Sequence, residues 1–360
     1  MKNPFLHKSV LKKKFLVFFC FSIQLTFTAV AVPPSGPNRS TLASEESKYF
    51  HGGVTKTIIG AYEEQFFLFE PNQPVPSKAP LIIFLHGWFS PNPEFYLGWV
   101  EHLCRSGWIV FFPCYQGGGE LPQRFSGNAI RSLKEALGIL RNGFHVWPDI
   151  DRVAIIGHES GGVVGANMAA APRYFKIPIP SVLMLVEPSR GMGGENDTGI
   201  DFFDLSGIRA NTLMLVIVGE HDFKTGQKTA KEIFYQADQI ESRNKNFITL
   251  LTDLYGNPAL VGDKFAPFSP LEPIFEREAV RRRTEFVKLY RSPMAARAIR
   301  SQGIDAMDFL GTWRLFDSLS KVSFEKGDRS ESLGDTEKQR FIGNWSDGRL
   351  IRGLLATERP

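Results

Sequence analysis

The sequence predicts an α/β protein in which a mostly parallel central sheet is flanked by helices and followed by a C-terminal helical extension. Short, continuously apolar segments recur between residues 81 and 251, as expected of strands buried on both faces of a sheet. Amphipathic segments with helical periodicity separate several of them. Strands and helices that alternate along a chain form a mostly parallel sheet covered on both sides.

We expect one α/β core at residues 50–266 of the 360-residue chain, a length that suits a large domain with additions. The core begins with two short segments of period-2 patterning, about 54–60 and 65–69, which predict an antiparallel edge. Buried strands are expected at 81–85, 108–112, 153–156, 182–186, 213–218 and 247–251. Helices are expected at 127–141, 162–171 and 229–237.

Residues 267–360 lack this alternation, and we expect them to form a helical extension packed on the core. A first helix, 270–291, mixes arginines with glutamates, which is typical of a solvated helix face. A second segment, 304–322, is amphipathic, with Phe309 and Trp313 among its apolar residues. Such a stripe predicts packing against the sheet domain.

Residues 1–31 have the composition of a secretory signal peptide. Lysines form a basic start, residues 15–30 are almost wholly apolar, and Ala29-Val30-Ala31 is a small-residue cleavage site. We expect cleavage after Ala31 and a secreted or periplasmic mature protein, with residues 32–49 as a linker. The alternative is a membrane anchor formed by the uncleaved leader, whose apolar stretch is at the short limit for crossing a bilayer.

The composition argues against several classes of function. The leader contains five lysines and no acidic residue, so its removal changes the formal net charge from +4 to −1. The mature chain therefore lacks the excess of basic residues that is typical of nucleic-acid-binding proteins. Histidines and cysteines are scattered without metal-ligand spacing, so we expect neither metal nor cofactor. Cys104 and Cys114 flank a predicted strand that would hold their Cα atoms beyond the limit of about 7 Å for a disulfide, which predicts two free thiols.

The most informative motif lies between Val153 and Gly165, which reads Val-Ala-Ile-Ile-Gly-His-Glu-Ser-Gly-Gly-Val-Val-Gly. It predicts a strand, a sharp turn and a helix. A nucleophile elbow carries serine at the tip of such a turn, in the form Gly-x-Ser-x-Gly. When the glycines are aligned with that frame, Glu159 stands at the tip and Ser160 falls on the variable position after it.

Over about residues 50–265 the chain resembles the α/β-hydrolase family, most closely its compact secreted members of the dienelactone-hydrolase, chlorophyllase and polyester-hydrolase-like groups. Besides the elbow, His86-Gly87-Trp88 follows one predicted strand and Gly219-Glu220-His221-Asp222 follows a later one. The resemblance implies that the backbone N–H groups of Trp88 and Ser160 form an oxyanion hole. It also implies that Asp222 is the acid, with Glu187 as a weaker candidate.

The family's catalytic histidine should follow the acid in the chain. None of the seven histidines does: they are His7, His51, His86, His102, His145, His158 and His221. The loop expected to carry it offers Leu254, Tyr255, Asn257 and Lys264 instead. An ion pair between Lys264 and Glu159 would block the position that the family uses for its nucleophile and base. We expect His86, His158, His221 and Tyr255 near the cleft, with His158 packed beneath the elbow.

These departures predict a hydrolase-fold protein that lacks the usual serine and histidine. We expect a non-catalytic pseudoenzyme that binds a small acyl or ester ligand, or a partner, in the remnant cleft. The alternative is an active, serine-type carboxylic ester hydrolase that uses Ser160 or Glu159 with a non-standard base such as Lys264. The sequence leaves the oligomeric state open.

Overall fold

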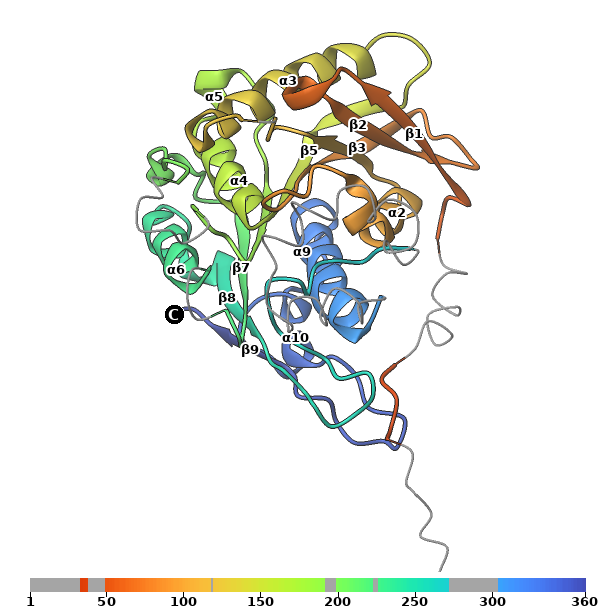
Figure 1. Cartoon of the computed structure of the whole chain (residues 1–360), viewed down its shortest axis with the longest axis vertical. Coiled ribbons are helices and arrows are strands. Elements are labelled where there is room, and N and C mark those ends of the chain that lie inside the picture. Colours follow the sequence, from red (N-terminus) through yellow and green to blue (C-terminus); the bar gives the residue numbers. More distant parts are fainter. Residues whose placement is uncertain (1–32, 38–48, 118, 192–198, 223–225, 272–303) are drawn as a thin grey trace, which may run out of the picture. The chain divides into compact units, whose positions relative to one another are not determined.

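The computed structural model describes residues 33–37, 49–117, 119–191, 199–222, 226–271 and 304–360 (Figure 1). The expected signal peptide, most of the linker, and all but the first two residues of the expected helix at 270–291 lie outside these ranges. Within them, no helix combines the length and apolar character that crossing a bilayer requires.

Nine strands form one sheet within the described ranges, in the order β1-β2-β4-β3-β5-β6-β7-β8-β9. The strands are β1 (Gly53–Ile59), β2 (Phe66–Asn72), β3 (Lys78–Leu85), β4 (Ile109–Pro113), β5 (Trp147–His158), β6 (Val182–Val186), β7 (Leu213–Gly219), β8 (Lys245–Leu250) and β9 (Leu354–Thr357). Neighbours from β4 to β8 pair in parallel, whereas β1, β2 and β9 pair antiparallel at the two edges. The predicted fold class, a mostly parallel sheet flanked by helices, is confirmed.

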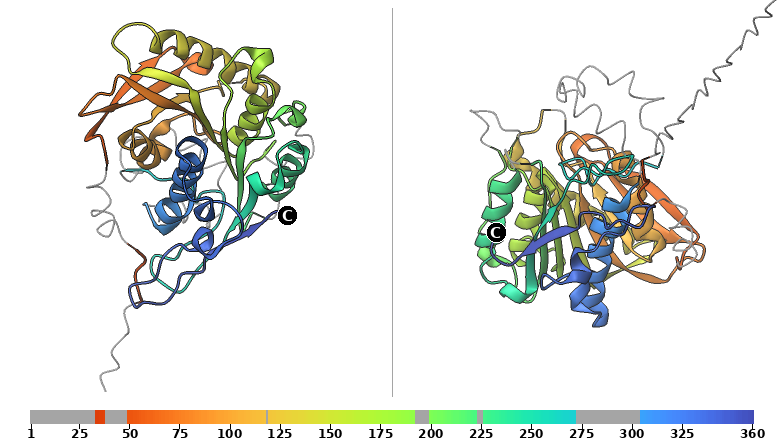
Figure 2. Two further views of the ribbon diagram at one scale, coloured as in Figure 1. Left: turned by 180° about the vertical axis from the view of Figure 1, so that it is seen from behind. Right: turned by 90° about the horizontal axis from the view of Figure 1, so that it is seen from below.

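The strands alternate their side chains between two hydrophobic clusters, as the strand period of two requires. In β3, Leu81 and Ile83 belong to one cluster, and Ile82 and Phe84 belong to the other. The first is covered by α3 (Phe125–Leu140), α4 (Ser160–Ala170), the short α5 (Pro172–Phe175) and α6 (Gly226–Gln236), and the second by α2 (Leu97–Arg105) and α9 (Arg314–Glu325) (Figure 1, Figure 2). Both faces of the sheet are therefore buried under helices, which explains why central strands such as β4, β6 and β7 are apolar and fully buried.

Residues 304–360 contribute to the sheet as well as to its cover. The expected helix at 304–322 is a π-helical segment, Met307–Trp313, that continues into α9. The short α10 (Glu337–Arg340) follows, and β9 then pairs with β8. We expected no strand here, because four residues are too few to show a period and β9 owes its conformation to pairing with β8.

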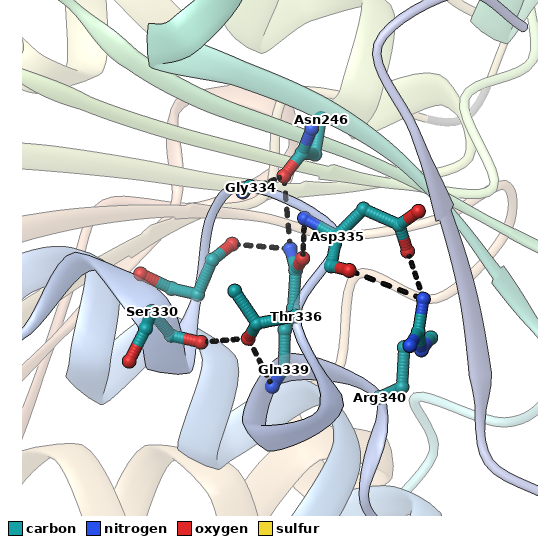
Figure 3. Close-up of polar contacts among 8 residues, drawn as sticks. Asn246, Ser330, Gly334, Asp335, Thr336, Gln339 and Arg340 are labelled. Carbon is teal, nitrogen blue, oxygen red and sulfur yellow. Dashed lines mark hydrogen bonds and ion pairs between the residues drawn. The ribbon is translucent and has the colours of Figure 1, made fainter.

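A buried polar network joins this C-terminal region to β8 (Figure 3). Gln339 of α10 is fully buried, and its amide nitrogen donates to Asn246 Oδ1 of β8 at 3.1 Å and to the carbonyl oxygen of Ser332. Its amide oxygen accepts from the Asp335 backbone N–H at 2.8 Å. One side chain thus joins β8 to the turn that precedes α10, across 93 positions of the chain.

We expect Gln339→Ala to lower the free energy of unfolding by about 2 kcal/mol, because it removes three hydrogen bonds made by a fully buried side chain. Urea unfolding measures this loss. The control is Lys338→Ala, which removes an exposed side chain whose ion pair with Asp328 should contribute little. Equal losses in the two variants would contradict the role given to the network.

Candidate functional site

The turn between β5 and α4 places Glu159 at its apex. Glu159 has φ +44° and ψ −113°, a conformation that residues with side chains seldom adopt. A Cβ on Gly161 would lie 2.1 Å from the carbonyl oxygen of Leu85, and one on Gly157 would lie 2.2 Å from the carbonyl oxygen of Gly161. Only glycine fits at either position, so the crowding that an elbow requires is present, with a carboxyl at the tip.

The Glu159 carboxyl packs on the backbone of the His86-Gly87-Trp88 turn. Its Oε2 accepts the Trp88 backbone N–H at 3.1 Å. A Cβ on Gly87 would lie 2.7 Å from the same oxygen, so the side chain and the turn are in close contact. The N–H that the family resemblance assigns to an oxyanion hole is therefore bound by the protein's own carboxylate.

The electrostatic surroundings of Glu159 come from the two loops that should carry the acid and the base. Burial raises the pKa of Glu159 to about 7, partly offset by the positive charge of Lys264 and by the Trp88 hydrogen bond, and the Asp222 charge adds to the rise. Lys264 and Asp222 thus both act on the tip residue. At this pKa the carboxyl is about half ionised at neutral pH.

Backbone contacts hold those two loops together. The His221 N–H donates to the Gly262 carbonyl at 3.0 Å, and the Glu220 N–H donates to the Leu250 carbonyl at 2.9 Å. A Cβ on Gly219 would lie 2.5 Å from Gly262, so glycine allows this close approach. The loop after β7 and the loop after β8 therefore meet beside the elbow.

The Ser160 hydroxyl is enclosed by side chains that follow β4. Ser160 is fully buried, and its Oγ accepts a hydrogen bond from Gln116 Nε2 at 2.7 Å. The Tyr115 hydroxyl lies 3.2 Å from the same oxygen. A hydroxyl enclosed in this way is not presented to a substrate.

His158 lies next to the tip but has both ring nitrogens engaged. Its Nε2 donates to the Lys264 carbonyl oxygen at 2.8 Å, which leaves Nδ1 to accept from the Tyr96 hydroxyl at 2.8 Å. Burial lowers the pKa of His158 to about 3. The ring is neutral and fixes the Lys264 backbone, which makes it a support of the elbow.

The other residues expected near the cleft are His86, His221 and Tyr255, and their surroundings differ. His86 is fully buried with Nδ1 bonded to the Gly87 carbonyl at 2.7 Å, and burial lowers the pKa of His86 to about 4. His221 is exposed on the loop after β7. The Tyr255 hydroxyl donates to Asp347 Oδ2 at 2.7 Å, which directs Tyr255 toward the C-terminal region.

Glu187 forms a second buried carboxyl beside the acid position. It follows β6 at φ +51° and accepts the Gly219 N–H through Oε1. Burial raises the pKa of Glu187 well above its usual range, and interaction with Asp222 raises it further. Burial and the neighbouring Asp222 therefore both favour the uncharged form of the Glu187 carboxyl.

Three residues of this site were not predicted: Tyr96, Tyr115 and Gln116. Tyr115 and Gln116 come shortly after β4 ends. Open α/β sheets bind ligands beyond the carboxyl ends of their parallel strands. The position of Tyr115 and Gln116 after a predicted strand could therefore have identified them as site residues. Tyr96 precedes α2 and carries no comparable signal, because only the folded chain brings its hydroxyl to His158.

Comparison with known proteins assigns no activity to this chain. No family model matches the sequence, and no curated protein matches it. A similar solved structure is that of carboxyl esterase 2 (TmelEST2) from the mycorrhizal fungus Tuber melanosporum, with a TM-score of 0.42 and 15% sequence identity. The match covers 56% of this chain and 77% of that chain. The chemistry of the site therefore rests on its own residues.

Proposed function

We propose that this chain is an α/β-hydrolase-fold protein without triad catalysis, whose remnant cleft binds a small acyl or ester ligand. The hydrogen bond from the Trp88 N–H to Glu159 Oε2 carries the proposal. An oxyanion hole accelerates acyl transfer only when its donors face the developing charge of the substrate. Here the Trp88 N–H already donates to the Glu159 carboxylate, and the Ser160 hydroxyl next to it is bonded to Gln116.

We expect the purified mature protein to remain unlabelled by a fluorophosphonate and to leave short-chain nitrophenyl esters intact. The physical reason is that the only hydroxyl in the elbow, on Ser160, is buried and hydrogen-bonded. Ser160→Ala should match the parent in both assays. Labelling of the parent that disappears in Ser160→Ala would overturn the proposal.

A second candidate function uses Glu159 as the nucleophile: with a pKa of about 7 the carboxyl is still about half ionised at neutral pH, and its ionised form is more basic than that of an ordinary glutamate. Attack on an ester by Glu159 would form an anhydride and release the alcohol. Hydrolysis of the anhydride then needs a base, for which Lys264 is the candidate. Intact-mass measurement after treatment with nitrophenyl acetate separates the cases, because an acyl adduct lost in Glu159→Gln would support this second function.

We also propose that the mature protein is secreted or periplasmic. The basic start, apolar stretch and Ala29-Val30-Ala31 site of the leader support this location. Amino-terminal sequencing of protein exported by the native host should begin at Val32. A chain that begins at residue 1 and stays with the membrane fraction would favour the uncleaved anchor.

A further inference from the structure

A cavity of about 930 Å³ lies between α2 and α9. Its lining includes Lys78 at the start of β3 and Trp108 just before β4. Glu159, by contrast, follows the C-terminal end of β5. The cavity therefore reaches the opposite end of the parallel strands from the elbow, and its volume is in the range of small-molecule sites.

Three segments bring a polar cluster to the wall of this cavity. The Tyr49 hydroxyl lies 2.7 Å from His102 Nδ1, and His102 Nε2 lies 2.8 Å from Asp317 Oδ2. A carboxylate only accepts, so His102 donates the hydrogen on Nε2 to Asp317. The Asp317 side chain is 29% exposed, and a carboxylate has room for further hydrogen bonds.

Aromatic side chains also line the cavity. The His102 ring stacks on Trp313, with centroids 4.9 Å apart and an interplanar angle of 26°. Trp313 and Phe309 belong to the π-helical segment and also line the cavity. π-helical turns are rare and occur frequently at functional sites. Trp108 and Phe324, whose centroids are 5.8 Å apart, add two further ring surfaces.

Most basic side chains of the wall are already bound within the protein. Lys78 and Arg152 both pair with Asp149, at 2.9 and 2.7 Å. The Arg314 guanidinium donates to backbone carbonyls, and that of Arg105 lies over the Tyr49 ring at 4.3 Å. Lys78 and these three arginines are poorly placed to bind an anion, whereas Asp317 offers an accessible acceptor.

We propose that this cavity is a second ligand site, which binds an uncharged ring compound that carries a hydroxyl group. The ring packs against Trp313, Phe309 and Trp108, and the hydroxyl donates a hydrogen bond to Asp317. The site is separate from the elbow. Its existence therefore does not depend on whether the elbow is catalytic.

Two probes that share a ring system test the proposal on the mature chain: 2-naphthol, which can donate a hydrogen bond, and 2-methoxynaphthalene, which cannot. We expect the parent to bind 2-naphthol about tenfold more tightly, measured by tryptophan fluorescence, as one hydrogen bond to a charged acceptor predicts. Asp317→Asn should remove most of that preference and leave 2-methoxynaphthalene unaffected. Asp328→Asn, an exposed carboxyl outside the cavity, should bind like the parent.

Two further variants test the proposal even if Asp317→Asn is unstable. Ser106→Trp places a bulky ring in the cavity and should weaken both probes, whereas Glu159→Gln should weaken neither. Equal affinity of the parent for the two probes, or no binding of either, would overturn the proposal. So would a loss of 2-naphthol affinity in Glu159→Gln, because the probe would then occupy the elbow.

Discussion

The double variant Glu159→Ser with Lys264→His should react with a fluorophosphonate at position 159, whereas the parent does not react. The first change places a hydroxyl at the strained apex and frees the Trp88 N–H. The second places an imidazole where Lys264 now acts on the tip, near Asp222. Because a positioned general base contributes about 10²–10⁴-fold, we expect labelling at least about 100-fold faster than in Glu159→Ser alone.

The controls separate a restored elbow from an unrelated reactive group. Adding Ser160→Ala should leave labelling unchanged, because that hydroxyl faces Gln116. Adding Asp222→Asn should slow labelling, since the acid would no longer orient the new imidazole. If the double variant folds, as judged by circular dichroism, and still fails to react, the remnant-cleft proposal is wrong.

Replacing Glu159 by glutamine should stabilise the protein at alkaline pH and change the pH dependence of its stability. The pKa of Glu159 is about 7 in the folded state and has an ordinary value of 4.5 when exposed. The folded chain therefore binds more protons between these values, so the Glu159 contribution is full below pH 4.5 and is lost as the pH rises through 7. A difference of this size corresponds to about 3 kcal/mol.

Urea unfolding at pH 5 and pH 8 measures this effect. We expect Glu159→Gln to differ little from the parent at pH 5 and to exceed it by up to about 3 kcal/mol at pH 8. Glu358→Gln, which changes an exposed carboxyl, should follow the parent at both values. A Glu159→Gln variant that is less stable than the parent at pH 8 would show that the ionised carboxyl is a net stabilising group.

The core strands were predictable because each is buried on both faces. Segments such as 182–186 are continuously apolar, and the structure places β6 at those same residues. The amphipathic helix α2 was missed, although Trp99, Val100 and Leu103 recur with helical spacing and are buried in the second cluster. Nine residues give too few turns for that period to stand out beside the strands.

The site was predictable only where local sequence controls it. The glycines around Glu159 are required by steric crowding within a few residues, so the alignment alone places the carboxyl at the tip. The hydrogen bonds from Trp88 to Glu159 and from Gln116 to Ser160 join residues 71 and 44 positions apart. Contacts of this kind depend on how the folded loops meet, and no local pattern encodes them.

The pairing of β9 with β8 affects how the protein behaves when its C-terminal end is shortened. Residues 354–357 of β9 pair with residues 250–247 of β8. Without β9, the backbone N–H and C=O groups on that edge of β8 would face water. An unprotected, apolar strand of this kind is a template for pairing with another chain. Removal of residues 354–360 should therefore promote self-association through β8, even though the elbow and both hydrophobic clusters are largely retained.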